Sequence, residues 1–303
     1  MYCRRTLLLF QSVLLFTGVF CAGGARALEI SGSSVLIDKY QQIKDILQNS
    51  SLGVPLFIES HEETDALQVD IYGTVDYPFE RIRETFPVLA HWCDIVPLHL
   101  NIKACTFKKQ NDLWLITLYS GRKYYQSPED AQEVQFRFRV AAQQPEYLAL
   151  SLIAEEGPLH TRDHRIEFDA IPLEGGKSFL HLRYAYRFDS WTRTAMKTYF
   201  STIGRGKVGF TVTGRDDKGN PVYVGGVKGA IERNAVRYYF AIQAYMDSLS
   251  APPGERFEAR INRWYDLTDR FPQQLFELEK GEYLTAKRKE RKNQLMLQDA
   301  LSR

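Results

Sequence analysis

The alternation of apolar and polar residues over 98–188 constrains the fold of this chain more than any other feature. It is clearest over 134–140, where Val, Phe, Phe and Val alternate with Gln, Arg and Arg, and over 180–188. A period of two is typical of strands with one buried and one solvated face. We therefore expect six strands, at about 98–107, 112–119, 131–141, 146–155, 163–171 and 178–188. Their connections are short and favour an antiparallel meander, because parallel neighbours need crossovers of about a dozen residues or more.

Two further strands are expected before the meander, at 54–59 and 67–72. After them, Pro78 is placed to open a helix that runs to about residue 90. A second short helix or turn is expected around Trp92. These elements form an α+β pattern rather than an alternating α/β one.

Helical periodicity returns after the meander, over 191–203 and over 225–249. In the longer helix the apolar residues recur every three or four positions and form one stripe. These residues are Ile231, Ala235, Tyr238, Ile242, Tyr245 and Leu249. Such a stripe has to pack on an apolar surface, and the concave face of the preceding sheet is the large partner that the sequence offers.

The first 27 residues have the pattern of a secretory signal peptide. Two early arginines precede an apolar run over 7–20, and the small-residue site Ala25-Arg26-Ala27 follows. No later window offers about 18 uninterrupted apolar residues, so we expect cleavage after Ala27 and a periplasmic or secreted protein. Cleavage removes three arginines and no acid, which changes the net charge from +2 to −1. A lipoprotein anchored at Cys21 is the alternative, although the residues before Cys21 match a lipobox poorly.

Two of the four cysteines, Cys93 and Cys105, remain after cleavage. In an oxidising compartment they can form a disulfide. The alternatives are a reactive thiol or a metal pair, for which His91 is the one obvious additional ligand nearby. The spacing leaves this choice open.

Composition excludes several classes of protein. The chain of 303 residues is 44% hydrophobic and 25% charged, which is typical of a globular protein and not of a disordered chain or a coiled coil. A net charge of +2 gives no support to nucleic-acid binding. Aromatic residues make up 13% of the chain, which suits a protein with large apolar walls.

Residues 204–209 read Gly-Arg-Gly-Lys-Val-Gly and match the G-x-G-x-x-G pattern of dinucleotide-binding loops. That chemistry needs the glycines between a parallel strand and a crossover helix. Here they follow a helix, so we interpret them as a flexible loop. No G-x-S-x-G elbow, P-loop or H-E-x-x-H motif occurs in the sequence.

His160 and His164 are four residues apart, which on a helix would place both rings on one face as metal ligands. They instead flank the start of a strand, where four residues separate side chains by about 13 Å. A solvent-facing or edge-strand pair is the simpler interpretation. His164 or Asp163 could still transfer protons if it pointed into a cavity.

The stretch 187–207 is basic and amphipathic, and Trp191, Arg193 and Lys197 lie in its helical part. A helix of this kind can lie in an anionic lipid headgroup layer. The alternative is a helix packed on the domain with an ordinary charged face. Membrane docking through Trp191, Arg193 and Lys197 is therefore a hypothesis of the sequence.

Residues 251–303 follow the break Ala-Pro-Pro-Gly at 251–254 and form a helical, basic C-terminal extension. Over 255–271 an amphipathic helix is expected, and the charged run 287–292 is interpreted as a solvated helix face. At the other end, 28–53 is expected to be a peripheral helical segment.

The order of these elements resembles the helix-grip architecture of the START-like and polyketide-cyclase (SRPBCC) superfamily. Residues 69–80, Val-Asp-Ile-Tyr-Gly-Thr-Val-Asp-Tyr-Pro-Phe-Glu, are similar to the first strand and helix of that family. Trp92-Cys93-Asp94-Ile95 stands where its second short helix ends, and 225–249 where its gripping helix lies. The resemblance covers 54–250. Residues 189–224 and 251–303 depart from a minimal member of the family.

The resemblance implies a curved antiparallel sheet wrapped around a long C-terminal helix, with a cavity between them for a lipid or other hydrophobic small molecule. It supplies no universal catalytic residues and no cofactor. We expect alternate residues of the sheet and the facing side of the helix to bind the ligand. These are Phe136, Phe138, Leu150, Leu182, Tyr184, Tyr186, Tyr238, Ile242 and Tyr245.

Three functions are open at this stage. The first is non-catalytic binding or transfer of a hydrophobic molecule. The second is a cyclase or dehydratase that uses the same cavity, with His164, Asp163 or His99 as acid–base groups. The third is a scaffold that contacts an envelope protein through 251–303.

Overall fold

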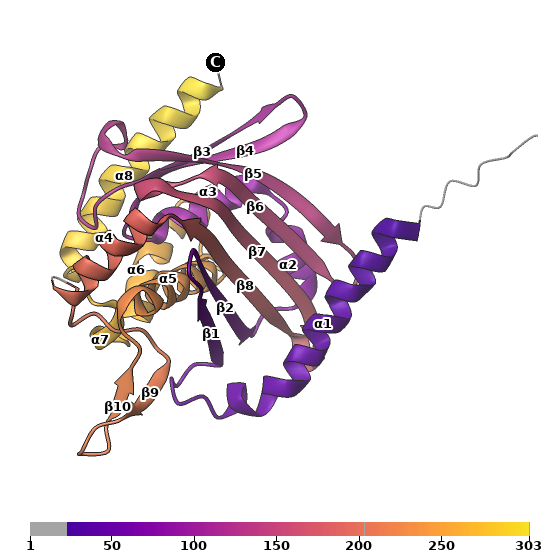
Figure 1. The fold of residues 1–303 in the computed structure, drawn as a ribbon. Coiled ribbons are helices and arrows are strands. Elements are labelled where there is room, and N and C mark those ends of the chain that lie inside the picture. Colours follow the sequence, from indigo (N-terminus) through magenta and orange to yellow (C-terminus); the bar gives the residue numbers. More distant parts are fainter. Residues whose placement is uncertain (1–22, 203, 303) are drawn as a thin grey trace, which may run out of the picture.

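The computed structural model describes the chain over residues 23–202 and 204–302 (Figure 1). Its strands are β1 Leu56–Glu62, β2 Ala66–Val75, β3 Ile102–Gln110, β4 Leu113–Ser120, β5 Gln132–Gln143, β6 Leu148–Glu156, β7 Thr161–Leu173, β8 Lys177–Phe188, β9 Val212–Arg215 and β10 Pro221–Tyr223. Its helices are α1 Gly23–Gln48, α2 Phe79–Thr85, α3 Leu89–Ile95, α4 Ser190–Ser201, α5 Gly226–Ser248, α6 Arg256–Asp269, α7 Pro272–Leu275 and α8 Lys280–Leu301.

Eight strands form one antiparallel sheet in the order β1-β2-β8-β7-β6-β5-β4-β3. The six strands β3 to β8 are the expected meander, so that prediction is confirmed. The N-terminal hairpin joins the meander through β2, where Ile71 lies opposite Leu182 of β8. Alternation places most of the buried apolar residues of the strands on the concave face.

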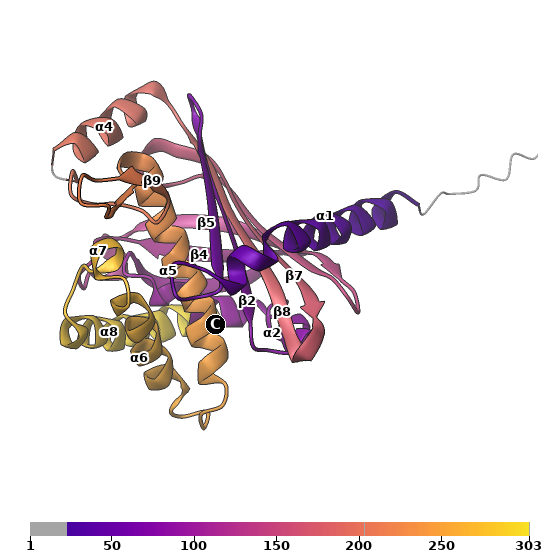
Figure 2. The same cartoon turned by 90° about the horizontal axis from the view of Figure 1, so that it is seen from below.

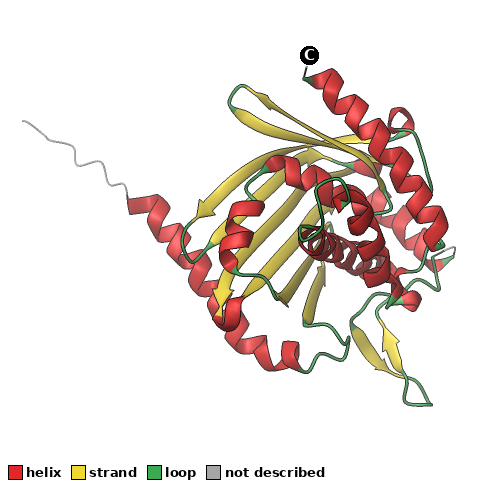
Figure 3. Cartoon of the chain, turned by 180° about the vertical axis from the view of Figure 1, so that it is seen from behind, coloured by secondary structure: helices red, strands yellow, loops and turns green. Residues whose placement is uncertain are grey.

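The sheet curves around α5, which lies along its concave face (Figure 3). Tyr239 of α5 shows how closely they pack, since a side chain at Gly73 of β2 would place its Cβ 2.1 Å from the Tyr239 hydroxyl oxygen. The chain therefore has the α+β helix-grip fold expected from the sequence, with a curved antiparallel sheet wrapped around a long helix.

The helix α5 is buried on two sides rather than along one stripe. Its far side packs against α6 and α7, and α8 packs in turn on α6 (Figure 2). Trp264 of α6 is fully buried and donates a hydrogen bond from Nε1 to the carbonyl oxygen of Arg237, at 2.9 Å. Arg237 of α5 is buried under this cover and donates a hydrogen bond to the carbonyl oxygen of Leu275. Glu232 and Arg233 are buried as well, but they form hydrogen bonds with residues 208–211.

The helix expected from Pro78 to about residue 90 is two helices, α2 and α3. Pro87 ends the first because proline has no N–H to donate to the carbonyl four residues earlier. That carbonyl, on Arg83, accepts a hydrogen bond from Gln143 Nε2 at 3.0 Å instead. The prediction was wrong in length and correct in the presence of a second helix around Trp92.

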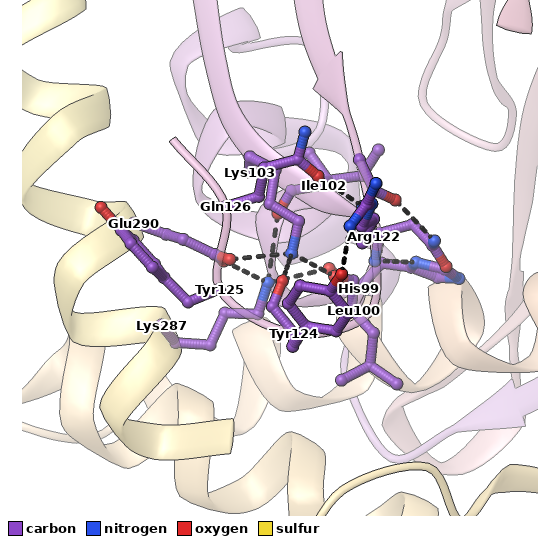
Figure 4. A network of polar contacts seen from close by, with 12 residues as sticks. His99, Leu100, Ile102, Lys103, Arg122, Tyr124, Tyr125, Gln126, Lys287 and Glu290 are labelled. Carbon is purple, nitrogen blue, oxygen red and sulfur yellow. Dashed lines mark hydrogen bonds and ion pairs between the residues drawn. The ribbon is translucent and has the colours of Figure 1, made fainter. Parts of the chain in front are cut away.

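The interpretation of 287–292 as a solvated helix face was wrong for two of its residues. Helix α8 packs on β3, and Lys287 and Glu290 are 4% and 2% exposed. Glu290 lies between two ammonium groups, at 2.8 Å from Lys103 Nζ and 2.7 Å from Lys287 Nζ (Figure 4). Each ammonium also donates to two backbone carbonyl groups. Charge content alone cannot reveal such a network, because Lys103 and Glu290 lie 187 residues apart in the sequence.

The helix α1 covers part of the convex face of the sheet (Figure 2). Its buried residues Leu36, Ile43 and Leu47 pack against outward-pointing residues such as Tyr72 and Phe179. The charged and apolar parts of the predicted signal peptide lie outside the described residues, and the predicted cleavage position after Ala27 lies within α1. None of the described helices has the length and apolar character needed to cross a membrane.

Candidate functional site

A cavity of about 100 Å³ lies between the concave face of the sheet and α5. Its walls are mainly apolar and come from α3, the meander strands and α5. The lining residues are Trp92, Ile95, Val96, Ile102, Leu118, Ser120, Val134, Phe136, Leu152, Pro158, His164, Ile166, Leu182, Tyr184, Ala235, Tyr238 and Ile242. An apolar cavity with a few polar groups is the usual form of a small-molecule site.

Five of the nine ligand-binding residues predicted from the sequence line this cavity: Phe136, Leu182, Tyr184, Tyr238 and Ile242. The other four do not border it. Phe138, Leu150 and Tyr245 are buried in the surrounding core, and Tyr186 is half-buried behind His164. Alternation identifies the inward face of a strand correctly, but it does not say which inward residues meet the helix and which meet open space.

The volume limits what this conformation can hold. Drug-sized ligands occupy pockets of roughly 300–1,000 Å³, whereas an engineered cavity of about 150 Å³ holds benzene. A cavity of about 100 Å³ therefore has room for one small ring or a short alkyl segment. A complete lipid would need the walls to move apart.

His164 is a buried polar residue of this wall. It was expected to face solvent or a strand edge, yet it is 3% exposed and borders the cavity. Its Nε2 lies 2.8 Å from Thr161 Oγ1, and its Nδ1 lies 3.0 Å from the Tyr184 hydroxyl oxygen. The ring stacks on Tyr186 at a centroid distance of 5.3 Å and meets the edge of Phe136.

Gly157 makes room for this histidine. A Cβ at position 157 would lie 2.0 Å from His164 Nε2, so only glycine allows the ring to sit there. Burial lowers the pKa of His164 to about 4, against a smaller opposite effect of Asp163. The ring is therefore neutral near pH 7. Burial also raises the pKa of Tyr184 well above its ordinary value, so this hydroxyl keeps its proton.

The other candidate acid–base groups lie elsewhere. Asp163 is exposed and forms an ion pair with Arg162 at 3.6 Å, which places its carboxylate outside the cavity. His99 is buried behind Tyr238, on which it stacks at 4.5 Å, and its Nδ1 accepts a hydrogen bond from the Asn101 N–H. Burial and the charge of Arg237 hold the pKa of His99 well below its usual range. It does not border the cavity.

No metal site accompanies these histidines. His160 is exposed and lies in a 3-10 turn, Pro158–His160, whereas His164 points into the protein. Over residues 23–202 and 204–302, no group of three or more His, Cys, Asp or Glu residues is arranged to hold a metal ion.

Cys93 and Cys105 form a disulfide that joins α3 to β3, with their Cα atoms 5.0 Å apart. The structure thus selects one of the alternatives that the sequence left open. His91 takes no part in it and contacts the carbonyl oxygen of Thr85 through Nδ1.

The backbone directly after the G-x-G-x-x-G stretch is bound by a side chain of the protein itself. Glu232 Oε2 accepts hydrogen bonds from the N–H groups of Phe210 and Thr211, directly after the last glycine, at 2.7 and 2.9 Å. Residues 204–209 themselves form a loop after α4, as expected, and do not stand between a parallel strand and a crossover helix.

Helix α4 places its three predicted membrane-docking residues differently. Trp191 is 84% exposed and Lys197 is exposed, whereas Arg193 is half-buried with its Nε enclosed and without a hydrogen-bond partner. Leu159, 74% exposed, lies beside them, because Thr192 Oγ1 donates a hydrogen bond to its carbonyl oxygen at 3.2 Å. Leu159 directly follows Pro158 of the cavity wall, so this exposed apolar tip adjoins the cavity.

A second polar cluster lies on the opposite, convex face of the sheet and was not predicted. His181 contacts two carboxylates, with Nε2 at 2.7 Å from Asp70 and Nδ1 at 3.1 Å from Asp169. Arg183 Nε also bonds Asp70, at 2.7 Å. Burial opposes the charge of His181, but the hydrogen bonds of both carboxylates outweigh it and raise its pKa. The four residues come from three strands, β2, β7 and β8, so no local sequence pattern could identify the cluster.

Sequence comparison finds no match for this chain among protein-family models or curated proteins. Solved structures of similar arrangement include human StAR-related lipid transfer protein 5, with a TM-score of 0.31 and 11% identity over 59% of this chain and 91% of that one. Norcoclaurine synthase from Thalictrum flavum has a TM-score of 0.32 and 10% identity over 48% and 91%. The Zhui aromatase/cyclase from Streptomyces sp. R1128 has a TM-score of 0.29 and 11% identity over 69% and 95%.

Proposed function

We propose that this protein binds a hydrophobic small molecule, or the hydrophobic part of a lipid, in the cavity between the sheet and α5. The observation that carries the proposal is the cavity itself, which is apolar, lies inside the grip of the sheet on the helix and contains few polar groups. Binding is driven by burial of apolar surface, at roughly 25 cal/mol per Å².

The protein works, in this proposal, in the periplasm or outside the cell after signal-peptide cleavage. The N-terminal sequence pattern supports this location. The disulfide between Cys93 and Cys105 supports it as well, because disulfides persist in oxidising compartments.

Native mass spectrometry of protein purified from its own envelope tests the binding. We expect a co-purifying mass that is released by organic solvent. A variant that fills the cavity from α5, Ala235→Leu, should lose this mass and still fold. Ala141→Leu, at an exposed position of β5, is the matched control and should retain it. Bare protein in the wild type, together with no binding from a panel of lipids and small hydrophobic molecules, would refute the proposal.

Contact with an anionic membrane surface through α4 is part of the same proposal. Trp191 and Leu159 present apolar side chains beside the cavity, and Lys197 adds positive charge. Vesicles of phosphatidylglycerol should shift the tryptophan fluorescence, and vesicles of phosphatidylcholine should not. Trp191→Ser should remove the shift. Trp114→Ser, a change at another exposed tryptophan, should leave it intact. An unchanged shift in Trp191→Ser would show that α4 does not insert.

An enzyme of the cyclase or dehydratase kind is the alternative function. The observation in its favour is the hydrogen bond between His164 and Tyr184 at the cavity wall. Turnover of any bound molecule, lost in His164→Gln, would establish it. A protein partner for 251–303 also stays a prediction; the side chains of α8 open to such a partner include Leu295 and Met296.

A further inference from the structure

The hydrogen-bonding direction of Tyr184 can be deduced from a chain of contacts that begins at Thr161. A threonine hydroxyl carries one proton and can donate one hydrogen bond. Thr161 Oγ1 donates to the carbonyl oxygen of Pro158, at 2.5 Å. A carbonyl oxygen can only accept, so the one hydroxyl proton of Thr161 lies in the hydrogen bond to the Pro158 carbonyl oxygen.

The next contact fixes the tautomer of His164. Its Nε2 lies 2.8 Å from Thr161 Oγ1, which has no proton left to donate. Nε2 must therefore carry the proton and donate. A neutral imidazole has one N–H, so Nδ1 is an acceptor. The low pKa of His164, caused by its burial, keeps the ring in this neutral form near pH 7.

The last contact then has one direction. Tyr184 lies 3.0 Å from His164 Nδ1 and must donate its hydroxyl proton to it. The Tyr184 oxygen retains only acceptor capacity. Tyr184 and His164 both border the cavity, so a ligand group that reaches the Tyr184 hydroxyl meets an acceptor there. Ser120 and Tyr238, which also border the cavity, have hydroxyl groups that can rotate to donate or accept, whereas Tyr184 cannot.

We infer that the bound molecule presents a hydrogen-bond donor to Tyr184, so that hydrophobic alcohols are preferred over ketones and ethers of the same shape. This inference rests on the proposed function and adds the polarity of the ligand to it. A carbonyl oxygen placed against Tyr184 would meet another acceptor and would be buried without a hydrogen-bond donor, whereas Tyr184 keeps its bond to His164.

The tautomer can be tested without any ligand. In protein with ¹⁵N-labelled histidine, the chemical shifts of the ring nitrogens distinguish a protonated from an unprotonated atom. We expect His164 at pH 7 to be protonated at Nε2 and unprotonated at Nδ1, with the signals assigned by their loss in His164→Gln. A proton on Nδ1 in the wild type would overturn the inference and leave the proposed function standing.

The ligand preference is tested with cyclohexanol and cyclohexanone, which are similar in size and polarity and differ in having a donor. Calorimetric titration of the wild type should show about tenfold tighter binding of the alcohol, or more. Tyr184→Phe should remove the preference. Thr161→Val should reduce it, because His164 can then protonate Nδ1 and free the Tyr184 proton for a carbonyl. Equal or reversed affinities in the wild type would refute the inference alone, whereas failure of both probes to bind would count against the proposed function.

Discussion

Replacing Glu290 by Gln tests whether the charged network beneath α8 holds the C-terminal helix to the sheet. Glu290 is 2% exposed and accepts one hydrogen bond from each of two buried ammonium groups, on Lys103 and Lys287. A glutamine offers one acceptor oxygen and turns an N–H₂ group toward the second ammonium. It also leaves two buried positive charges without a negative one. Breaking a buried ion pair in this way costs about 3–5 kcal/mol of folding free energy.

Chemical denaturation at pH 7, without reductant, measures this cost. Glu258→Gln is the matched surface control, because Glu258 of α6 bonds Arg288 of α8 with both side chains about half exposed. Its loss should be below about 1 kcal/mol. A cost for Glu290→Gln that is no larger than that of the control would refute the reasoning.

A double variant checks the electrostatic part of the argument. Lys287→Met removes one of the two positive charges, and burial together with the charge of Lys103 already lowers the pKa of Lys287 to about 8 despite Glu290. The combination of Lys287→Met and Glu290→Gln should therefore be destabilised by less than the sum of the single variants, by roughly 2 kcal/mol. Strict additivity would show that the two side chains do not interact.

Three further predictions concern other parts of the fold. Gly157→Ala should destabilise the protein by about 1–3 kcal/mol and displace His164, since the new Cβ would lie 2.0 Å from His164 Nε2. Gly214→Ala is the control, because a Cβ there meets nothing within 4 Å, and it should be nearly neutral in the same denaturation assay. Because the pKa of His181 is raised, its contribution to stability is complete below about pH 6.5 and is lost as the pH rises through the folded-state pKa. The stability difference between wild type and His181→Gln should therefore shrink with rising pH. A difference that stays constant with pH would contradict this. Replacing Cys93 and Cys105 together by Ser should cost about 3 kcal/mol, because the disulfide closes a loop with a sequence separation of 12, and an unchanged denaturation midpoint would contradict that estimate.

The elements that repeat a short pattern could be predicted from the sequence, and the contacts between distant elements could not. Periodicity of two over 98–188 identified all six strands of the meander, and their short connections identified its topology. The spacing of Ile231, Ala235, Tyr238 and Ile242 identified the helix that the sheet grips. Both patterns are local consequences of burying one face of an element, so they are present in the chain before it folds.

The residues that line the cavity depend on tertiary packing, whereas the positions of the helices and strands do not. Phe136 and Phe138 have the same alternation, yet only Phe136 borders the cavity, because the packing of α3 and α5 decides where space remains. His164 had the pattern of an exposed residue at a strand start. It is buried because Gly157 leaves room for the ring and Thr161 and Tyr184 satisfy its nitrogens.

The C-terminal extension shows most clearly which properties could be predicted from the sequence and which depend on tertiary contacts. Its composition predicted a helix and its charges predicted solvent exposure, and α8 is indeed helical. Burial of Lys287 and Glu290 became favourable only because β3 and the residues before it brought Lys103 and several backbone carbonyl groups to the same place. A charged side chain is buried when partners replace its water, and those partners come from residues far away in the sequence. The positions of helices and strands can thus be predicted from the local periodicity of the sequence. The polarity of the cavity and the burial of charged side chains depend on contacts between segments that are distant in the sequence.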